Sequence, residues 1–346
     1  MNFKSVLKYL IPFGLAGIIL YFLFTDNDID IVDMMATLKE ANYRWVLLSM
    51  VLSLVSHWAR AYRWQLLFKP LGYRLAVLRL MVLLMCMYVV NLVLPRAGEV
   101  YRCGLLKRTD GVPISTSFGT VLVERIFDAI SLLLILLLDL IIEYDRLNAF
   151  FRSSITTAWS DKGNLAQLII YAMLAGLFLL LVLYLLYRAY KHKFLQHRLY
   201  LKVLSVLGDF KKGLTSFKHV DNKLGFFLST LVIWLTYYLM SYVMIYSIPE
   251  THDLTPLAGL SILAMAGLAM VAPVQGGFGT YHYLVGGVLV VYGISKPDGL
   301  AFATLLHTSQ LVTIIAVGAV CLVLAQTFAK RKIAKDNDRI KDLQHK

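Results

Sequence analysis

The sequence predicts an all-α, polytopic membrane helix bundle, and three observations lead to this fold class. Of 346 residues, 59% are hydrophobic and 16% are charged, whereas soluble domains carry about 25% charged residues. The mean hydropathy is +0.68. Apolar segments that can each cross a bilayer about 30 Å thick recur along the whole length. No remaining stretch is long enough for a soluble catalytic domain of ordinary size.

Six apolar segments are predicted to be full spans, and two further segments are broken. The full spans are Tyr9–Phe24, Trp45–Phe68, Ser117–Ile142, Leu165–Tyr187, Leu224–Ser247 and Leu300–Phe328. The first has no small-residue cleavage site, so we expect an uncleaved anchor rather than a signal peptide. The broken segments, Leu75–Leu94 and Leu257–Gly293, end in or contain Pro/Gly clusters. We expect one membrane domain over residues 1–328 and a basic tail over residues 329–346.

The distribution of charge predicts the orientation. Lys and Arg accumulate on the cytoplasmic side of membrane proteins. The segment Arg188–Lys223 has nine Lys/Arg and two acids, and the tail from Lys330 has seven and three. Thr25–Arg44 instead has five acids and two basic residues. We therefore expect a multi-pass protein of the cell membrane with both termini in the cytoplasm. The net charge of +13 is then a topology signal, and nucleic acid is not an expected partner.

The same rule places the two broken segments. Leu75–Leu94 lies between two groups of basic residues, so it should begin and end on the inner side and turn near residues 95–99. Leu257–Gly293 should begin and end on the outer side and turn near residues 272–279. Both are predicted to be re-entrant hairpins, because irregular backbone at membrane depth is tolerated where protein or water lines it. Eight ordinary spans are the alternative.

A weak internal repeat accompanies this topology. The order span, broken hairpin, span occurs twice with opposite orientation. Arg125 and Asp128 in the first half correspond to His307 and Gln310 in the second. Paired broken segments that meet near the midplane are typical of inverted-repeat transporters.

Charged residues inside the third predicted span require an explanation. Glu124, Arg125 and Asp128 lie within Ser117–Ile142, and charges at this depth are costly unless they are paired or face a cavity. Glu124 and Asp128 share one helical face, whereas Arg125 is turned about 100° aside. We expect Arg125 to reach another helix, and the acids to find their cations elsewhere. The candidate cations are Arg60, Arg63, Arg96 and Arg102.

Two interpretations of this cluster remain open. It could lock the helices together without a ligand. Alternatively, its five arginines, against Glu99, Glu124 and Asp128, could bind a phosphate, since the guanidinium fork suits bidentate phosphate binding. The tail of an anionic phospholipid or of a polyprenyl-phosphate-type lipid would remain in the bilayer. The predicted substrate-binding residues here are Arg60, Arg63, Arg96, Glu99, Arg102, Glu124, Arg125 and Asp128.

The second turn adds Gln275, Gly276, Gly277 and Gly279 to the predicted binding residues. Gly-rich turns before a helix can hold an anion through backbone N–H groups, although close helix packing by small residues explains the glycines equally well. His307 completes the set, either as an interior histidine or as a proton carrier. Trp64 and Tyr237 are predicted to be interface anchors. The three cysteines lie far apart with no CxxC spacing, so neither a disulfide framework nor a zinc site is indicated, and no cofactor is predicted.

Several of these motifs resemble a known family. Asn91-Leu92-Val93-Leu94-Pro95-Arg96-Ala97-Gly98-Glu99, with Arg102, Gly111-Val112-Pro113, Glu124-Arg125 and Asp128, resembles the lysylphosphatidylglycerol synthase transmembrane region, also called the flippase-like domain. The turn that includes Gly276-Gly277-Phe278-Gly279 resembles its second signature. This domain is the N-terminal membrane part of the multiple peptide resistance factor. The resemblance implies movement of a lipid between leaflets.

The resemblance also bears on the enzymatic activity of this chain. In that factor the synthase activity belongs to a C-terminal aminoacyl-transferase domain, and this chain ends at Lys346 soon after its last predicted span. Lysyl transfer is therefore not expected, and a flippase of an anionic lipid is favoured over an enzyme. A membrane enzyme acting on a lipid phosphate or lipid-linked sugar, and a non-catalytic accessory subunit, are the alternatives. The expected partners are membrane lipids, and homo-oligomerisation is left open.

Overall fold

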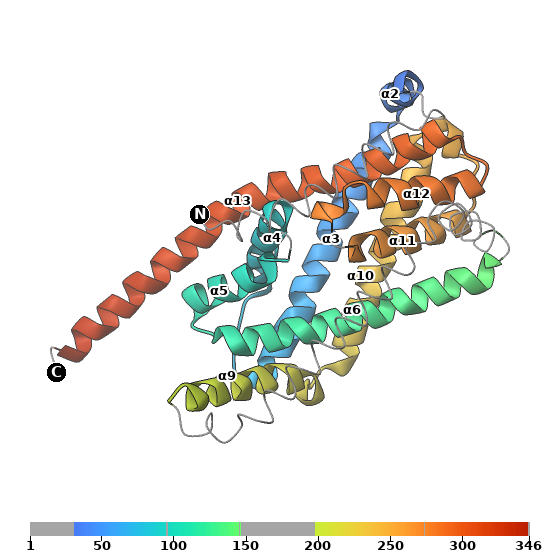
Figure 1. Ribbon diagram of the computed structural model, residues 1–346. Helices are drawn as coiled ribbons and strands as arrows, with labels where there is room; N and C mark the ends of the chain where they lie inside the picture. The colour runs from blue at the N-terminus through green and yellow to red at the C-terminus, as the bar shows by residue number, and fades with distance from the viewer. Residues whose placement is uncertain (1–30, 95, 145, 147–197, 273, 345–346) are drawn as a thin grey trace.

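The computed structural model describes residues 31–94, 96–144, 146, 198–272 and 274–344. In this part of the chain the fold is all-helical, with ten α-helices and no strand (Figure 1). The helices are α2 Ile31–Glu40, α3 Tyr43–Phe68, α4 Val77–Val93, α5 Gly98–Asp110, α6 Ile114–Ile142, α9 Arg198–Thr215, α10 Lys223–Met244, α11 Pro256–Val271, α12 Thr280–Val291 and α13 Lys296–Gln344.

Four of the six predicted spans coincide with long helices: α3, α6, α10 and α13. Lys223–Ser247 and Lys296–Lys330 are long and apolar enough to cross a membrane. α6, of 29 residues, instead carries the charged residues noted in the sequence. The predicted spans Tyr9–Phe24 and Leu165–Tyr187 lie outside the described residues. The prediction of an all-helical bundle is confirmed.

The two broken segments form two helical hairpins, α4–α5 and α11–α12. Their limbs have 17, 13, 16 and 12 residues, which is shorter than the roughly 20 residues of an ordinary span. The two hairpins lie toward opposite ends of the bundle (Figure 1), where α3 packs against α4 and α10 packs against α11. Their turns meet, because Gln275 Nε2 donates hydrogen bonds to the carbonyl oxygens of Asn91 (3.0 Å) and Leu92 at the end of α4.

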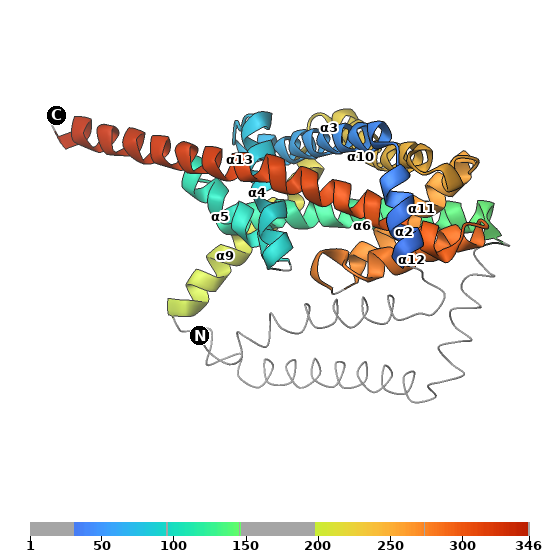
Figure 2. The ribbon, with the colours of Figure 1, turned by 90° about the horizontal axis from the view of Figure 1, so that it is seen from above.

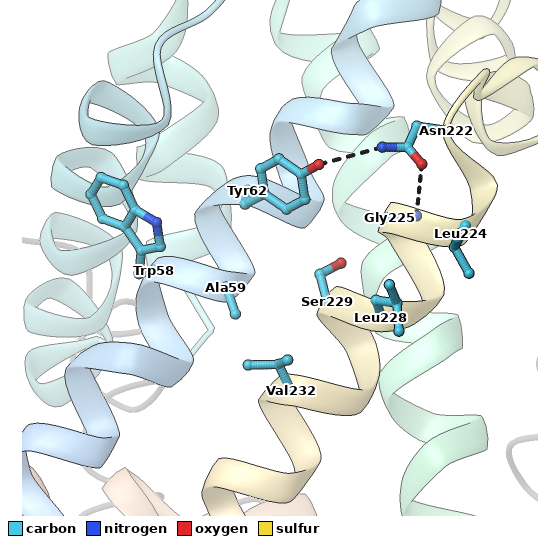
Figure 3. A pocket seen from close by; sticks show the side chains of 9 residues that line it. All are labelled: Trp58, Ala59, Tyr62, Asn222, Leu224, Gly225, Leu228, Ser229 and Val232. Carbon is cyan, nitrogen blue, oxygen red and sulfur yellow. Dashed lines mark hydrogen bonds between the residues drawn. The ribbon is translucent and has the colours of Figure 1, made fainter.

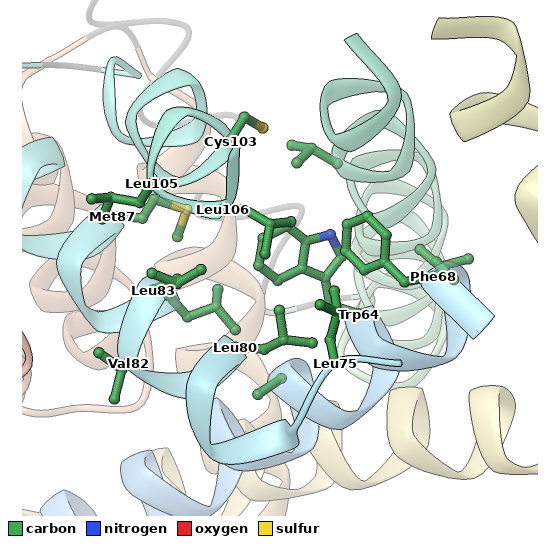
Figure 4. Packing of buried hydrophobic residues seen from close by; sticks show 14 of the residues in the cluster. Trp64, Phe68, Leu75, Leu80, Val82, Leu83, Met87, Cys103, Leu105 and Leu106 are labelled. Carbon is green, nitrogen blue, oxygen red and sulfur yellow. The ribbon is translucent and has the colours of Figure 1, made fainter. Parts of the chain in front are cut away.

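The buried apolar residues form two clusters, one around each hairpin. The first gathers side chains of α3, α4 and α5 around the buried Trp64 (Figure 4). The second gathers side chains of α11, α12 and α13. α13 contacts both hairpins, and its C-terminal half extends beyond the other helices (Figure 2).

The two ends of the bundle differ in charge. At one end α2 reaches α13, where Thr37 Oγ1 donates to Asp298 Oδ1 at 2.8 Å. The start of α3 meets the end of α10 there, since Asn42 N donates to Ser247 O at 2.7 Å. Acidic side chains outnumber basic ones on the elements at this end: Asp33, Glu40, Glu250, Asp253 and Asp298 against Lys39, Arg44 and Lys296. α9 and the open end of the α4–α5 hairpin lie at the other end (Figure 1). Basic side chains gather there: Lys69, Arg74, Lys107, Arg108, Lys211, Lys212, Lys218 and Lys223.

Candidate functional site

A carboxylate held by two arginines joins α3 to α6. Arg60 Nη1 lies 2.7 Å from Asp128 Oδ2, and Arg63 Nη2 lies 2.6 Å from Asp128 Oδ1. Spacing of three residues places Arg60 and Arg63 on nearly the same side of α3, so each guanidinium reaches one oxygen of the same carboxylate. The Arg63 side chain has no exposed area, and that of Asp128 is 13% exposed.

The third long helix, α10, completes this site. Arg60 Nε donates to Tyr237 Oη at 2.9 Å, and Arg63 Nη1 donates to Thr230 Oγ1 at 3.2 Å. The guanidinium of Arg63 also lies over the ring of Phe226, 5.8 Å from its centroid. Asp128 and the two arginines therefore link α3, α6 and α10 in one charged cluster.

A second buried ion pair joins α5 to α6, one turn earlier along α6. Arg102 Nη2 lies 2.5 Å from Glu124 Oε2, and the two side chains are 0% and 1% exposed. The Arg102 guanidinium stacks on Trp64, 4.2 Å from the ring centroid, and Trp64 Nε1 donates to Thr120 Oγ1 at 3.0 Å. Trp64 was predicted to be an interface anchor, and this prediction is wrong because the ring is fully buried under Arg102.

The salt bridges of Asp128 and Glu124 leave one arginine charge without a matching carboxylate and several buried polar atoms without a hydrogen bond. Three buried arginines, Arg60, Arg63 and Arg102, face two carboxylates, Asp128 and Glu124. Within the described residues, Arg63 Nε, Arg102 Nε and Nη1, and Glu124 Oε1 have no hydrogen-bond partner. Buried guanidinium groups are strongly disfavoured unless they are neutralised and hydrogen-bonded. The cluster therefore carries one positive charge that its carboxylates do not neutralise, together with N–H donors that have no partner.

The remaining charged residues of the predicted site lie at its edge. Arg125 is exposed and makes no ion pair with any side chain in the described ranges, so the expectation that it reaches another helix stays a prediction. Arg96 is exposed in the first turn with φ 58°, and its Nη2 donates to Val271 O at 3.4 Å. Glu99 is half-buried and accepts a hydrogen bond from Asn91 Nδ2 at 3.5 Å.

The second turn lies against the first rather than within the charged cluster. Gly276, Gly277 and Gly279 have φ angles of 58°, 77° and 82°, which glycine adopts readily. His307 on α13 contacts this turn, with Nε2 2.9 Å from Gly276 O, and its ring stacks on Tyr281 at 4.6 Å. This bonding is that of an interior histidine, which is one of the two roles left open from the sequence.

An apolar groove lies on α3 and α10, which are two of the three helices that form the charged cluster around Asp128. It has a volume of about 490 Å³ and is lined by α3 and α10, including Trp58, Leu228 and Val232 (Figure 3). At one end Asn222 Nδ2 lies 3.5 Å from Tyr62 Oη. The lining residues Ala59 and Ser229 directly adjoin Arg60 and Thr230 in the sequence. The groove and the charged cluster thus share α3 and α10, although no arginine of the cluster lines the groove.

Sequence reasoning missed several neutral partners of the site. Tyr237 was predicted to be an interface anchor, but its hydroxyl binds Arg60. Thr230 and Thr120 were not predicted to belong to the site, because the sequence does not indicate which side chain a threonine in an apolar span will bind. Asn91 was quoted within the first motif, and its Oδ1 accepts from Gly98 N at 2.8 Å across the α4–α5 turn.

Comparison with known proteins identifies a family for most of the chain. The family model described as "Lysylphosphatidylglycerol synthase TM region" matches residues 9–318. Searches of the curated proteins and of the solved structures found no match. Within the described residues, no group of three or more His, Cys, Asp or Glu side chains could hold a metal ion.

Proposed function

The chain belongs to the lysylphosphatidylglycerol synthase transmembrane-region family, and on that premise we propose that it moves an anionic lipid, or a lipid-linked phosphate intermediate, between the leaflets of the cell membrane. Family membership and the apolar helices make it a membrane protein with a lipid-related function. The observation that carries the proposal is the surplus of buried arginine over carboxylate between α3, α5 and α6.

The chemistry of the cluster suits a phosphate headgroup. A phosphodiester presents anionic oxygens to guanidinium N–H donors, and such charge-assisted hydrogen bonds are about twice as strong as neutral ones. The uncommitted N–H groups of Arg63 and Arg102 would bind the phosphate. Arg96 and Arg125, both exposed, would attract it from either side of the cluster. The groove beside Arg60 is apolar along Leu228 and Val232, which suits an acyl or prenyl chain.

The proposed transport mechanism places the two hairpins in the membrane as re-entrant segments of an inverted repeat, entering from opposite faces. Three observations support it. The four limbs are shorter than ordinary spans. The open ends of the hairpins lie at opposite ends of the bundle, one basic and one acidic. The turns meet through Gln275. In this topology both termini are cytoplasmic, and each hairpin gates one face.

Arg60→Gln tests the function, because it removes the surplus charge while the Arg63–Asp128 pair remains. We expect translocation of fluorescent phosphatidylglycerol in proteoliposomes to fall about tenfold or more, because the cluster loses the positive charge that attracts the headgroup and a loss of about 1.4 kcal/mol of binding is already tenfold. Fluorescent phosphatidylcholine reports on unspecific leakage. Arg79→Gln is the matched control, because Arg79 is 38% exposed and lies outside the cluster.

The outcomes separate the alternatives. If the purified Arg60→Gln variant translocates at the wild-type rate, the cluster is a structural lock and the proposal is wrong. A chemically altered lipid recovered from the liposomes would instead indicate an enzyme. An accessory subunit would neither move nor alter the lipid in the absence of its partner protein.

Cysteine labelling tests the topology. Single cysteines at positions 70–74 and at positions 107–110 are expected to react with a membrane-impermeant maleimide from the same, cytoplasmic, face. These positions flank the open end of the α4–α5 hairpin, where Arg79 pairs with Asp110. The native cysteines Cys86, Cys103 and Cys321 are buried and provide a low background. Labelling of the two groups from opposite faces would make α4 a true span.

A further inference from the structure

A buried carboxylate outside the arginine cluster lies near the acidic end of α6. The side chain of Asp139 has no exposed area. Its Oδ1 accepts a hydrogen bond of 2.7 Å from Ser261 Oγ on α11, whereas its Oδ2 has no hydrogen-bond partner among the described residues. Asp139 therefore has one oxygen that is hydrogen-bonded and one that is buried without a partner.

Among the described residues around Asp139, no cation neutralises its carboxylate. One turn along α6, Glu143 pairs with Arg146 at 2.8 Å, and the Arg146 guanidinium lies over the ring of Tyr292, 4.8 Å from its centroid. Tyr292, at the end of α12, lies 2.9 Å from Ser261 Oγ. α11 carries no ionisable side chain. In this part of the chain, Arg146 is the nearby cation, and it is committed to Glu143.

The contact between α6 and α11 is close enough to exclude water from Asp139. Two turns earlier along α6, Leu132 packs on Gly267, where an added Cβ would lie 2.4 Å from Leu132 Cδ1. Contacts at Leu132–Gly267 and Asp139–Ser261 therefore hold α11 along α6. Access of water to the carboxylate requires the α11–α12 hairpin to move away from α6.

We propose that Asp139 is a proton-binding site that couples the α11–α12 hairpin to the proton concentration on the outer side. With the hairpin closed, the carboxylic acid is neutral, because an unpaired carboxylate in an apolar interior is strongly disfavoured. When the hairpin opens, the acid's O–H bond breaks, water takes the proton, and the carboxylate is left hydrated. A proton fits better than a metal ion, since hard cations require about six oxygens and Asp139 offers one uncommitted oxygen.

Infrared difference spectroscopy of the purified full chain tests the site without any transport measurement. Over about pH 5 to pH 9, we expect a protonated carboxylic-acid band that titrates in the wild type and is missing in Asp139→Asn. Glu143→Gln, one turn away, should retain the band. Ser261→Ala should move the titration midpoint, which gives a second readout if Asp139→Asn fails to fold. A spectrum without this band at every pH, or one unchanged in Asp139→Asn, would overturn the proposal.

The coupling is tested by accessibility in proteoliposomes. Ala264 is fully buried on α11, one turn from Ser261, so an Ala264→Cys probe reports opening of the hairpin. We expect maleimide labelling from outside to accelerate as the outer pH rises, and Asp139→Asn to remove this dependence. A sodium dependence in place of the pH dependence would contradict a proton site. The inference rests on the proposed function for its role in transport and for the placement of this hairpin at the outer face, so a titrating band without lipid translocation would refute the flippase and leave the proton site intact.

Discussion

Replacement of Asp128 by asparagine is expected to reduce the free energy of unfolding by about 3–5 kcal/mol, the cost of removing one partner from a buried ion pair. Asparagine preserves the shape of the side chain but leaves Arg60 and Arg63 without the carboxylate that binds both of them at 2.6–2.7 Å. Arg63 has no exposed area, so water cannot replace the lost charge. The thermal or denaturant unfolding of the purified protein in detergent measures the effect.

Asp110→Asn is the matched control for Asp128→Asn. Asp110 is 9% exposed and also pairs with an arginine, but that partner, Arg79, is 38% exposed, so water can hydrate the arginine when the carboxylate is lost and a smaller loss than in Asp128→Asn is expected. The double variant Arg60→Gln, Asp128→Asn should recover part of the lost stability, because one unpaired cation is removed with the anion. Equal losses of unfolding free energy in Asp128→Asn and Asp110→Asn would show that Asp128 stabilises the fold no more than Asp110 does.

The sequence was sufficient to predict that the acids of α6 find cations on other helices. The reasoning was that isolated charges at this depth are too costly, and three of the four candidate arginines do form the pairs: Arg102 with Glu124, and Arg60 and Arg63 with Asp128. Which arginine meets which acid depends on the rotation and spacing of three helices. That information lies in tertiary packing rather than in the spacing of residues along the chain.

The same limit explains the predictions that failed and the residues that were missed. Arg125 lies on an exposed face of α6, and whether it reaches another helix stays a prediction. Trp64 has the composition of an interface anchor, yet it is buried because α5 places Arg102 over its ring. Asp139 lies near the end of an apolar span, where an acid is unremarkable. Its burial follows from α11, which begins more than a hundred residues later.

The positions of the two hairpin turns were predictable from the sequence. Breaks near residues 95–99 and 272–279 were predicted from Pro and Gly, and α4 and α11 end at Val93 and Val271. The correspondence of the two turns in an inverted repeat remains a prediction. Their direct contact through Gln275 could not be predicted, because it joins segments 184 residues apart.

Gly98→Ala is expected to have the second large effect, because Gly98 is where α5 lies directly against α4. An added Cβ would lie 2.2 Å from Met87 O and 2.7 Å from Asn91 Oδ1, and the first of these is backbone, which cannot turn aside. The start of α5 would have to move away from α4, and the hydrogen bond from Gly98 N to Asn91 Oδ1 would lengthen. Overpacking of this kind costs about 1–3 kcal/mol.

The displacement at Gly98 also bears on function, since Arg102 follows one turn later on α5 and its pair with Glu124 depends on where that helix lies. We therefore expect Gly98→Ala to lower both the unfolding midpoint and lipid translocation. Gly104→Ala on the same helix is the control: no atom lies within 4 Å of its added Cβ, and alanine favours a helix over glycine by about 1 kcal/mol. Gly104→Ala should keep or raise stability with translocation unchanged. If the two variants behave alike, the close approach of α4 and α5 does not position Arg102.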